Sequence, residues 1–319
     1  VGFRLKQGET VTLPDDMYEV WAGAVQRVLG GDGQDVQALE VGAALGLELD
    51  EVEWTAVCAR QSASDPQSIT ERLVMARLLR RVDGGWAMVH GMLRESLVRA
   101  ARDNGRWADH NRACVAMLRE RYSEGGPGMG ARLGRHLLEA GEYLGALAPL
   151  LAGAEEHQAQ SEFREAMDLL DRRDRAVDAL ELPETAGERL EGWLARSAAL
   201  AARGRPLEAD EWAERVQRVV GKQPGWDAMR ANAAHHRARA LRQQDRLALA
   251  EQHYVQALTY FRRVDDSPRV GACLHGLGRL FEQRGHYDQA IQALEMARVA
   301  YAGADLALDL AQCVHALAL

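Results

Sequence analysis

Lysine is almost absent from this sequence. The 319-residue chain has 39 basic residues, of which only Lys6 and Lys222 are lysines. Each is followed by glutamine, whereas a phosphate-binding P-loop requires Gly-Lys followed by Ser or Thr. The chain therefore lacks a nucleotide-hydrolysing loop of that type, and we expect that it is not a P-loop ATPase by itself.

Cysteines and long apolar runs are also scarce. The four cysteines are far apart and form no Cys-x-x-Cys pair, so we expect buried, reduced thiols and a cytoplasmic location. No apolar run approaches the roughly 18 residues that span a bilayer, and no signal peptide is recognisable. We therefore expect no membrane association.

The sequence contains none of the common catalytic or zinc-binding motifs. His-Glu-x-x-His, Gly-x-Ser-x-Gly and clustered cysteines are all missing, so we expect no enzyme activity, no metal and no cofactor in this chain. The net charge of −8 disfavours a general partner among nucleic acids or anionic membranes. Because Val1 stands in place of an initiator methionine, and the C-terminal residues stop inside a helical pattern, we expect a fragment of a longer protein.

The composition favours helices. Aromatic residues make up only 6%, and the abundant Ala, Leu, Arg and Glu lose little side-chain freedom in a helix. We therefore expect an all-α protein with almost no β-structure.

A pattern of small and large apolar residues repeats about every 40 residues in the second half of the chain. In its clearest copy, Leu277 and Gly278 are followed by Phe281, Ala290 and Leu294 at the spacing of a tetratricopeptide helix-turn-helix unit. We expect a TPR-like right-handed α-superhelix over 125–319, with an extra helix at 161–180 whose pairing the pattern does not fix. The expected repeats are 127–160, 190–223, 231–264, 271–304 and a partial copy at 305–319.

Residues 32–124 have a different organisation. Three helical stretches at 38–45, 52–59 and 69–79 precede two short alternating runs joined by Asp83-Gly84-Gly85, a β-hairpin signal. Three helices followed by a hairpin predict a winged-helix domain. We expect two further helices after it, and residues 1–31 to be the tail of a preceding module.

The run from Ala38 to Gly46, Trp54, and the run from Gly85 to Glu95 resemble the winged-helix segment of the STAND signal-transduction ATPases. In that family this segment follows a nucleotide-binding domain and precedes a superhelical repeat sensor, and bacterial members are often fused to serine/threonine kinases or transcription regulators. The resemblance implies that ADP or ATP binds in an ATPase domain missing from this chain. It also implies that His90 occupies the place of the histidine that contacts the ADP phosphate. The alternative is that His90 caps the following helix or packs below the hairpin.

Polar residues recur on the first helix of the last repeats, where tetratricopeptide arrays bind ligands. Histidines recur at intervals of 40 residues, and arginines accompany them, which suits a protein or peptide ligand that carries carboxylate or phosphate groups. The alternative is that these imidazoles pack against the neighbouring helix. The predicted groove residues are Asn232, His235, Arg239, Arg242, His275, Arg279, Gln283 and His315.

Together these features predict the regulatory sensor region of a signalling ATPase or kinase. Partner capture in the groove would be transmitted through the winged helix to an intramolecular ATPase domain. A passive TPR scaffold is one alternative, and a DNA-binding regulator is another. The latter would use Arg72, Arg77, Arg80 and Arg81 of the third helix, although its neighbouring apolar residues leave little polar face for reading bases. We also expect self-association through the partial repeat at 305–319, which leaves an apolar face.

Overall fold

The computed structural model describes residues 15–30 and 33–302, and these form two compact units that divide between Ala146 and Leu147. The division lies inside one helix, whereas the sequence predicts a domain boundary after residue 124. At that predicted boundary the chain makes a glycine-rich turn, in which Gly125 and Gly128 adopt positive φ angles of 79° and 73°.

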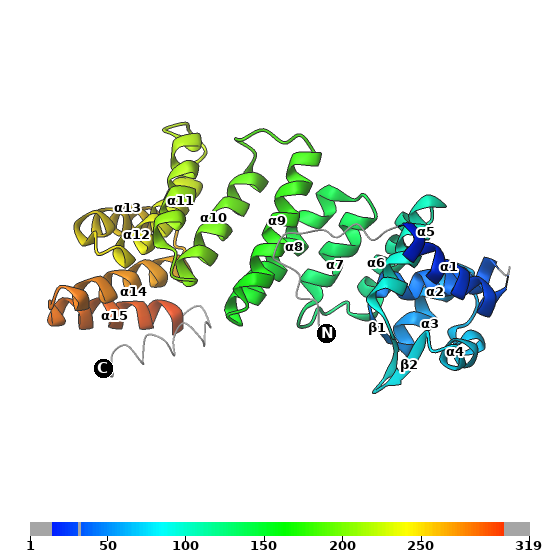
Figure 1. The fold of residues 1–319 in the computed structure, drawn as a ribbon. Helices are drawn as coiled ribbons and strands as arrows, with labels where there is room; N and C mark the ends of the chain where they lie inside the picture. The colour runs from blue at the N-terminus through cyan, green and yellow to red at the C-terminus, as the bar shows by residue number, and fades with distance from the viewer. Residues whose placement is uncertain (1–14, 31–32, 303–319) are drawn as a thin grey trace. The chain divides into compact units, whose positions relative to one another are not determined.

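The first unit is mostly helical and carries one small sheet (Figure 1). Its elements are α1 (Asp15–Leu29), α2 (Gly33–Leu45), β1 (Glu48–Asp50), α3 (Glu51–Arg60), α4 (Pro66–Met75), β2 (Leu79–Val82), β3 (Gly85–Met88), α5 (Gly91–Asp103), α6 (Trp107–Arg121) and α7 (Met129–Glu139). The three helices and the hairpin expected from the sequence are present. Strand β1 adds a third, three-residue strand to the expected hairpin, and the expectation of a mostly helical chain with very little β-structure is confirmed for the described residues.

The third helix of this block is shorter than the sequence predicts. It ends at Met75 rather than at residue 79, because Arg77 adopts a φ of 57°, which is incompatible with a right-handed helix. Leu79 and the two arginines after it belong to β2. The basic edge that would have lain on one helix is therefore divided between α4, a turn and a strand.

An aspartate side chain caps the N-terminus of both α3 and α4. The Asp50 carboxylate accepts hydrogen bonds from the backbone N–H groups of Val52 and Glu53 at the start of α3. At the start of α4, Asp65 accepts from Gln67 N–H, and Pro66 occupies the first helical turn, where its missing N–H costs nothing.

The sheet is antiparallel with strand order β1-β3-β2. Gly84 turns the β2–β3 hairpin with a φ of 78°, as the Asp-Gly-Gly signal predicts. Gly85 pairs with both neighbouring strands, and a Cβ there would lie only 1.9 Å from the backbone oxygen of Leu49. Only glycine at position 85 allows β1 and β3 to approach this closely.

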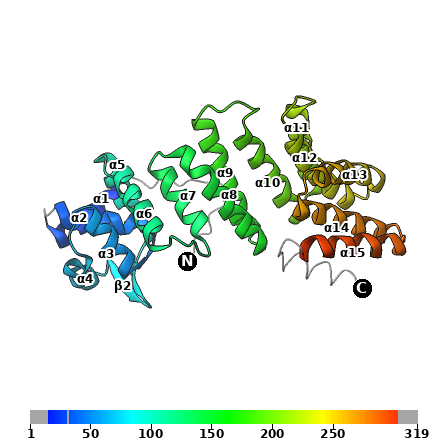
Figure 2. The same ribbon diagram turned by 180° about the vertical axis from the view of Figure 1, so that it is seen from behind.

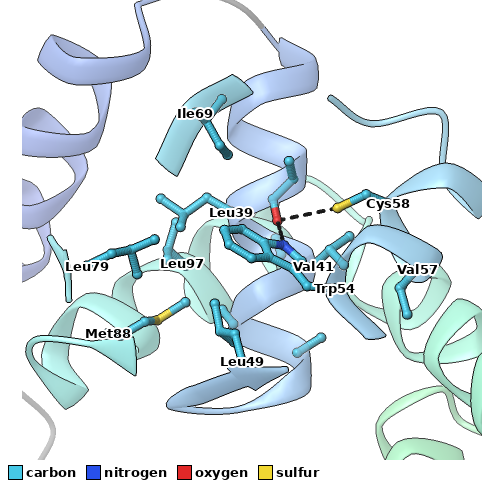
Figure 3. Packing of buried hydrophobic residues seen from close by; sticks show 14 of the residues in the cluster. Leu39, Val41, Leu49, Trp54, Val57, Cys58, Ile69, Leu79, Met88 and Leu97 are labelled. Carbon is cyan, nitrogen blue, oxygen red and sulfur yellow. Dashed lines mark hydrogen bonds between the residues drawn. The ribbon is translucent and has the colours of Figure 1, made fainter. Parts of the chain in front are cut away.

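Trp54 lies at the centre of the first hydrophobic core (Figure 3). Its indole Nε1 donates a hydrogen bond of 2.7 Å to the backbone oxygen of Ala38, and the Cys58 thiol contacts the same oxygen at 3.9 Å. Burial raises the pKa of Cys58 to about 12. The thiol is therefore protonated and unreactive at neutral pH.

Two buried carboxylates join the helices of this unit. Arg106 makes two hydrogen bonds to Glu40, at 2.9 and 2.7 Å, and His110 Nε2 lies 3.1 Å from the same carboxylate. Arg132 of α7 likewise binds both oxygens of Glu53 in α3. Burial alone would raise the pKa of Glu40, but the hydrogen bonds from His110 and Arg106 outweigh it and hold the pKa below its usual value.

The second unit consists of helices (Figures 1 and 2). Its elements are the remainder of α8 (Tyr143–Ala159), then α9 (Phe163–Ala179), α10 (Gly187–Ala202), α11 (Pro206–Val220), α12 (Asp227–Gln243), α13 (Leu247–Arg263), α14 (Ser267–Gln283) and α15 (Tyr287–Ala302). From α10 onward, consecutive helices lie side by side in pairs. Each pair overlaps one of the repeats expected at 190–223, 231–264 and 271–304, and each first helix begins a few residues earlier than expected.

Helix α9, the extra helix whose pairing the sequence does not fix, packs between α8 and α10. Its Arg173 is fully buried and donates to the backbone oxygens of Leu147 at 3.1 Å and Glu188 at 2.6 Å. A Cβ at Gly192 would lie 2.4 Å from the Arg173 guanidinium, so the glycine makes room for the arginine.

Glycines allow α14 to approach its neighbours closely. A Cβ on Gly278 would lie 2.6 Å from Leu294 of α15, and one on Gly276 would lie 2.4 Å from the Tyr254 ring of α13. The small residues of the repeat pattern therefore occur where two helices meet, as the sequence predicts.

Candidate partner-binding surface

The predicted groove residues are carried by α12 and α14, the first helices of the last two described pairs. Asn232, His235, Arg239 and Arg242 lie on α12, and His275, Arg279 and Gln283 lie on α14. Two contacts bring these helices together. His235 Nδ1 lies 3.5 Å from Cys273 Sγ, and Arg242 Nη1 donates to Gln283 Oε1 at 3.1 Å. His315, the eighth predicted residue, is outside the described residues.

His235 makes the packing contacts that the alternative interpretation of the histidines expects. Its ring lies edge-on to Tyr254, with a centroid distance of 5.8 Å, and edge-on to His236 at 5.6 Å. Burial lowers the pKa of His235 to about 4 and raises that of Cys273 to about 12. The imidazole and the thiol are therefore both neutral at pH 7, so the pair is not an activated nucleophile. A role for His235 in ligand binding stays a prediction.

Arg239 and Arg242 project near the buried Tyr254. Both guanidinium groups affect this phenol: burial raises the pKa of Tyr254, and Arg242 partly offsets the rise through its charge and a hydrogen bond. Arg239 is half-buried, and burial lowers its pKa. Both arginines therefore lie close enough to the Tyr254 phenol to lower its pKa against the effect of burial.

The charge on α14 is balanced locally. Arg279 Nη1 lies 2.9 Å from a carboxylate oxygen of Glu282, one helical turn further along, and both side chains are half-buried. Gln283 is exposed, and its amide oxygen accepts from Arg242. Its amide N–H₂ group therefore points away from that arginine and can donate elsewhere.

Tyr254 contributes to this surface but is not among the residues predicted from the first helix of each pair. It belongs to α13, the second helix of its pair, and is only 1% exposed. The repeat pattern marks it as a packing residue. Its polar end could have been suspected, because a buried tyrosine hydroxyl requires a hydrogen-bond partner.

His90 is an exposed residue immediately after the hairpin, at the N-cap position of α5. Its side chain makes no capping hydrogen bond, so the capping alternative is wrong. Instead its ring lies against Trp21 of α1, with a centroid distance of 5.2 Å. The phosphate-sensing role implied by the family resemblance stays a prediction.

Two of the arginines considered for DNA binding are engaged by other side chains of this unit. Arg72 on α4 forms an ion pair of 2.5 Å with Asp35, whereas Arg81 on β2 lies over the Trp86 ring at 5.0 Å. Between them, Met75 is 88% exposed at the end of α4. An apolar helix end of this kind gives no hydrogen bonds to base edges.

Over residues 15–30 and 33–302, no group of three or more His, Cys, Asp or Glu side chains is placed to hold a metal ion. No helix in the same ranges is both long and apolar enough to cross a membrane.

A model of the tetratricopeptide repeat matches residues 229–301, which spans α12 to α15. No curated protein sequence matches the chain.

Three solved structures are similar to this chain. BtubC from P. vanneervenii is 19% identical over 66% of this chain and 83% of its own, with a TM-score of 0.41. A putative kinesin light chain with TPR-like repeats from Podosopora anserina is 22% identical over 65% of this chain and 93% of its own, with a TM-score of 0.39. A STAND protein with a tetratricopeptide repeat sensor from Pyrococcus horikoshii is 13% identical over 98% of this chain and 50% of its own, with a TM-score of 0.44.

Proposed function

We propose that this chain is a non-catalytic sensor region that binds a protein or peptide partner on the first helices of its repeats. The observation that carries the proposal is the tetratricopeptide match over residues 229–301, together with the polar side chains that α12 and α14 share. Helical repeats bury a continuous core between neighbours and present an extended surface suited to binding another chain.

The proposal also includes a role for the first unit in transmitting partner binding to a nucleotide-binding module. Its order of elements, with a three-stranded antiparallel sheet and a hairpin before α5, supports a winged-helix domain. Together with the sequence resemblance to the STAND ATPases, this supports a winged helix that joins a nucleotide-binding module to the repeats. In this proposal, partner binding changes how the winged helix engages that module.

Peptide selection followed by hydrogen exchange tests the partner-binding half. Peptides would be selected from a random library on the intact chain, and amide exchange would then be measured with and without a selected peptide. We expect increased protection in α12 and α14. Protection confined to the first unit, or no selectable peptide at all, would contradict the proposal.

The coupling half requires a longer protein that carries a nucleotide-binding module before residue 1. There, His90→Ala should accelerate release of labelled ADP, because the imidazole would no longer donate a hydrogen bond to a phosphate oxygen. Trp21→Leu is the matched control, since it removes the ring that His90 packs against and retains the imidazole. Unchanged ADP release in His90→Ala would remove this role and leave the passive scaffold as the better interpretation.

A further inference from the structure

Arg239 and Arg242 differ from the other arginines of the second unit. Every other half-buried or buried arginine between residues 147 and 302 has a carboxylate within 4 Å. Within the described part of the chain, Arg239 and Arg242 have none. These two are therefore the partly buried cations of this unit whose charge no acidic side chain compensates.

The positions of Arg239 and Arg242 make their uncompensated positive charges energetically unfavourable. The two residues are three apart on α12, so their side chains lie on the same helix face. The positive charge of Arg242 adds to burial in lowering the pKa of Arg239. A half-buried cation beside a second cation is destabilised unless an anion neutralises both.

At the same place, hydrogen-bond donors remain unused in the part of the chain that the structure describes. Arg242 commits Nη1 to Gln283 Oε1, but its Nε is buried and has no hydrogen-bond partner among the described residues. Gln283 accepts that bond through its oxygen, which leaves its amide N–H₂ group as a donor on the exposed side. The Arg242 guanidinium therefore lies beside the Gln283 amide of α14, and Arg239 lies one turn earlier on the same face of α12.

We infer that Arg239, Arg242 and Gln283 form a binding site for an anionic group carried by a peptide partner. Guanidinium groups bind planar carboxylates and phosphates through paired, charge-assisted hydrogen bonds, and the amide adds a third donor. The anion completes the charge balance that the other arginines of the unit obtain from neighbouring Asp and Glu side chains. The inference deepens the proposed function and rests on it, because it specifies the chemistry of the partner that the repeats bind.

Fluorescence anisotropy with three labelled peptides tests the site. The first peptide alternates Glu and Ala, the second replaces two Glu residues with phosphoserine, and the third replaces every Glu with Gln. We expect the intact chain to bind both anionic peptides at least about tenfold more tightly than the Gln peptide. Stronger binding of the phosphoserine peptide would identify a phosphorylated partner, and equal binding of the two would identify an acidic one.

The variants locate the effect. Arg239→Gln and Arg242→Gln should each weaken anionic binding by about tenfold, and the double variant should bind all three peptides alike. Arg262→Gln is the matched control, because it removes the same charge from an exposed position on α13. Equal binding of the Glu and Gln peptides by the intact chain, or an unchanged preference in the double variant, would overturn the site. If all three peptides bind alike and protect α12 and α14, the site fails while the proposed function stands.

A stability measurement separates an anion site from a structural role. Arg237 lies on the same helix but is paired with Asp210 at 2.8 Å and with Glu214 at 3.5 Å. Arg237→Gln should lower the urea midpoint, whereas Arg239→Gln should leave it unchanged or raise it, since no ion pair is lost. A loss in Arg239→Gln equal to that in Arg237→Gln would show that Arg239 serves the fold rather than a ligand.

Discussion

Arg173 Nη1 donates a hydrogen bond of 2.6 Å to the backbone oxygen of Glu188, which attaches α9 to the first turn of α10. The same guanidinium reaches back to Leu147 on α8 through Nε. A single buried side chain therefore connects three consecutive helices at the point where the regular pairs begin. Glu191 lies 3.7 Å away and offsets its charge, although burial still lowers the pKa of Arg173.

Replacing Arg173 with Met should destabilise the second unit by about 2–4 kcal/mol, since two backbone oxygens lose a buried donor and the shorter side chain leaves a gap. Urea unfolding followed by circular dichroism measures the change. Arg172→Met is the control, because its pair with Asp168 within the same helix is partly exposed and is worth about 0.3–0.5 kcal/mol. Equal losses in the two variants would contradict the role of the buried guanidinium.

Gly278→Ala should destabilise the last helix pair by about 1–3 kcal/mol, although alanine is the better helix former. The added methyl group would lie 2.6 Å from Leu294, too close for any helix contact. Gly145→Ala on α8 is the matched control. Its nearest neighbour would be 3.7 Å away, so helix propensity should stabilise that variant by about 0.5–1 kcal/mol. Thermal unfolding of both variants checks the opposite signs.

Glu40→Gln should cost about 3 kcal/mol at pH 7, because it leaves Arg106 and the buried His110 without their carboxylate. The pKa of Glu40 is lowered in the folded state, so its contribution is complete above the unfolded value of about 4.3 and is lost as pH falls through the folded value. The difference between wild type and variant should therefore shrink below about pH 4. Urea midpoints at several pH values measure it, with the exposed Glu71→Gln as control. A difference that persists at low pH would contradict the assignment.

The half-buried His235 and His236 of α12 should make the repeats sensitive to acid. Burial, with the positive charges of Arg239 and Arg269, lowers the pKa of His235 to about 4, and burial lowers that of His236 to about 3. Because unfolded histidine titrates near 6.5, stability should be complete above that pH and decline as pH falls toward 4. Replacing both histidines with Asn should flatten this decline in a thermal unfolding series. His286→Asn, at an exposed position, should leave it unchanged.

The sequence predicts the helix pairs well because small residues recur at the positions where the two helices of a pair come into contact. Gly278 and Ala290 lie where the two helices of the last pair meet, and that requirement is local to one repeat. By contrast, β1 has only three residues, and its pairing with β3 depends on a contact between Leu49 and Trp86 that no local pattern encodes. The early end of α4 could not be predicted from the sequence either, because arginine does not favour the positive φ angle that Arg77 adopts.

The candidate surface is only partly predictable for a related reason. Repeat spacing places His235 and Arg239 on the first helix, but it does not fix how far each side chain is buried or what lies against it. The contact between His235 and Cys273 joins two repeats, and each residue alone resembles an ordinary core position. Similarly, the lack of a carboxylate beside Arg239 among the described residues is visible only once helices α12 to α15 are in place.

The glycines of α14 also limit how the last repeats can move. Gly276 faces the Tyr254 ring and Gly278 faces Leu294, and neither leaves space for even a methyl group. Sliding of α14 along α13 or α15 would drive backbone into side chain within a fraction of a helical turn. Helices α13 to α15 can therefore tilt about these close contacts more easily than they can slide along one another.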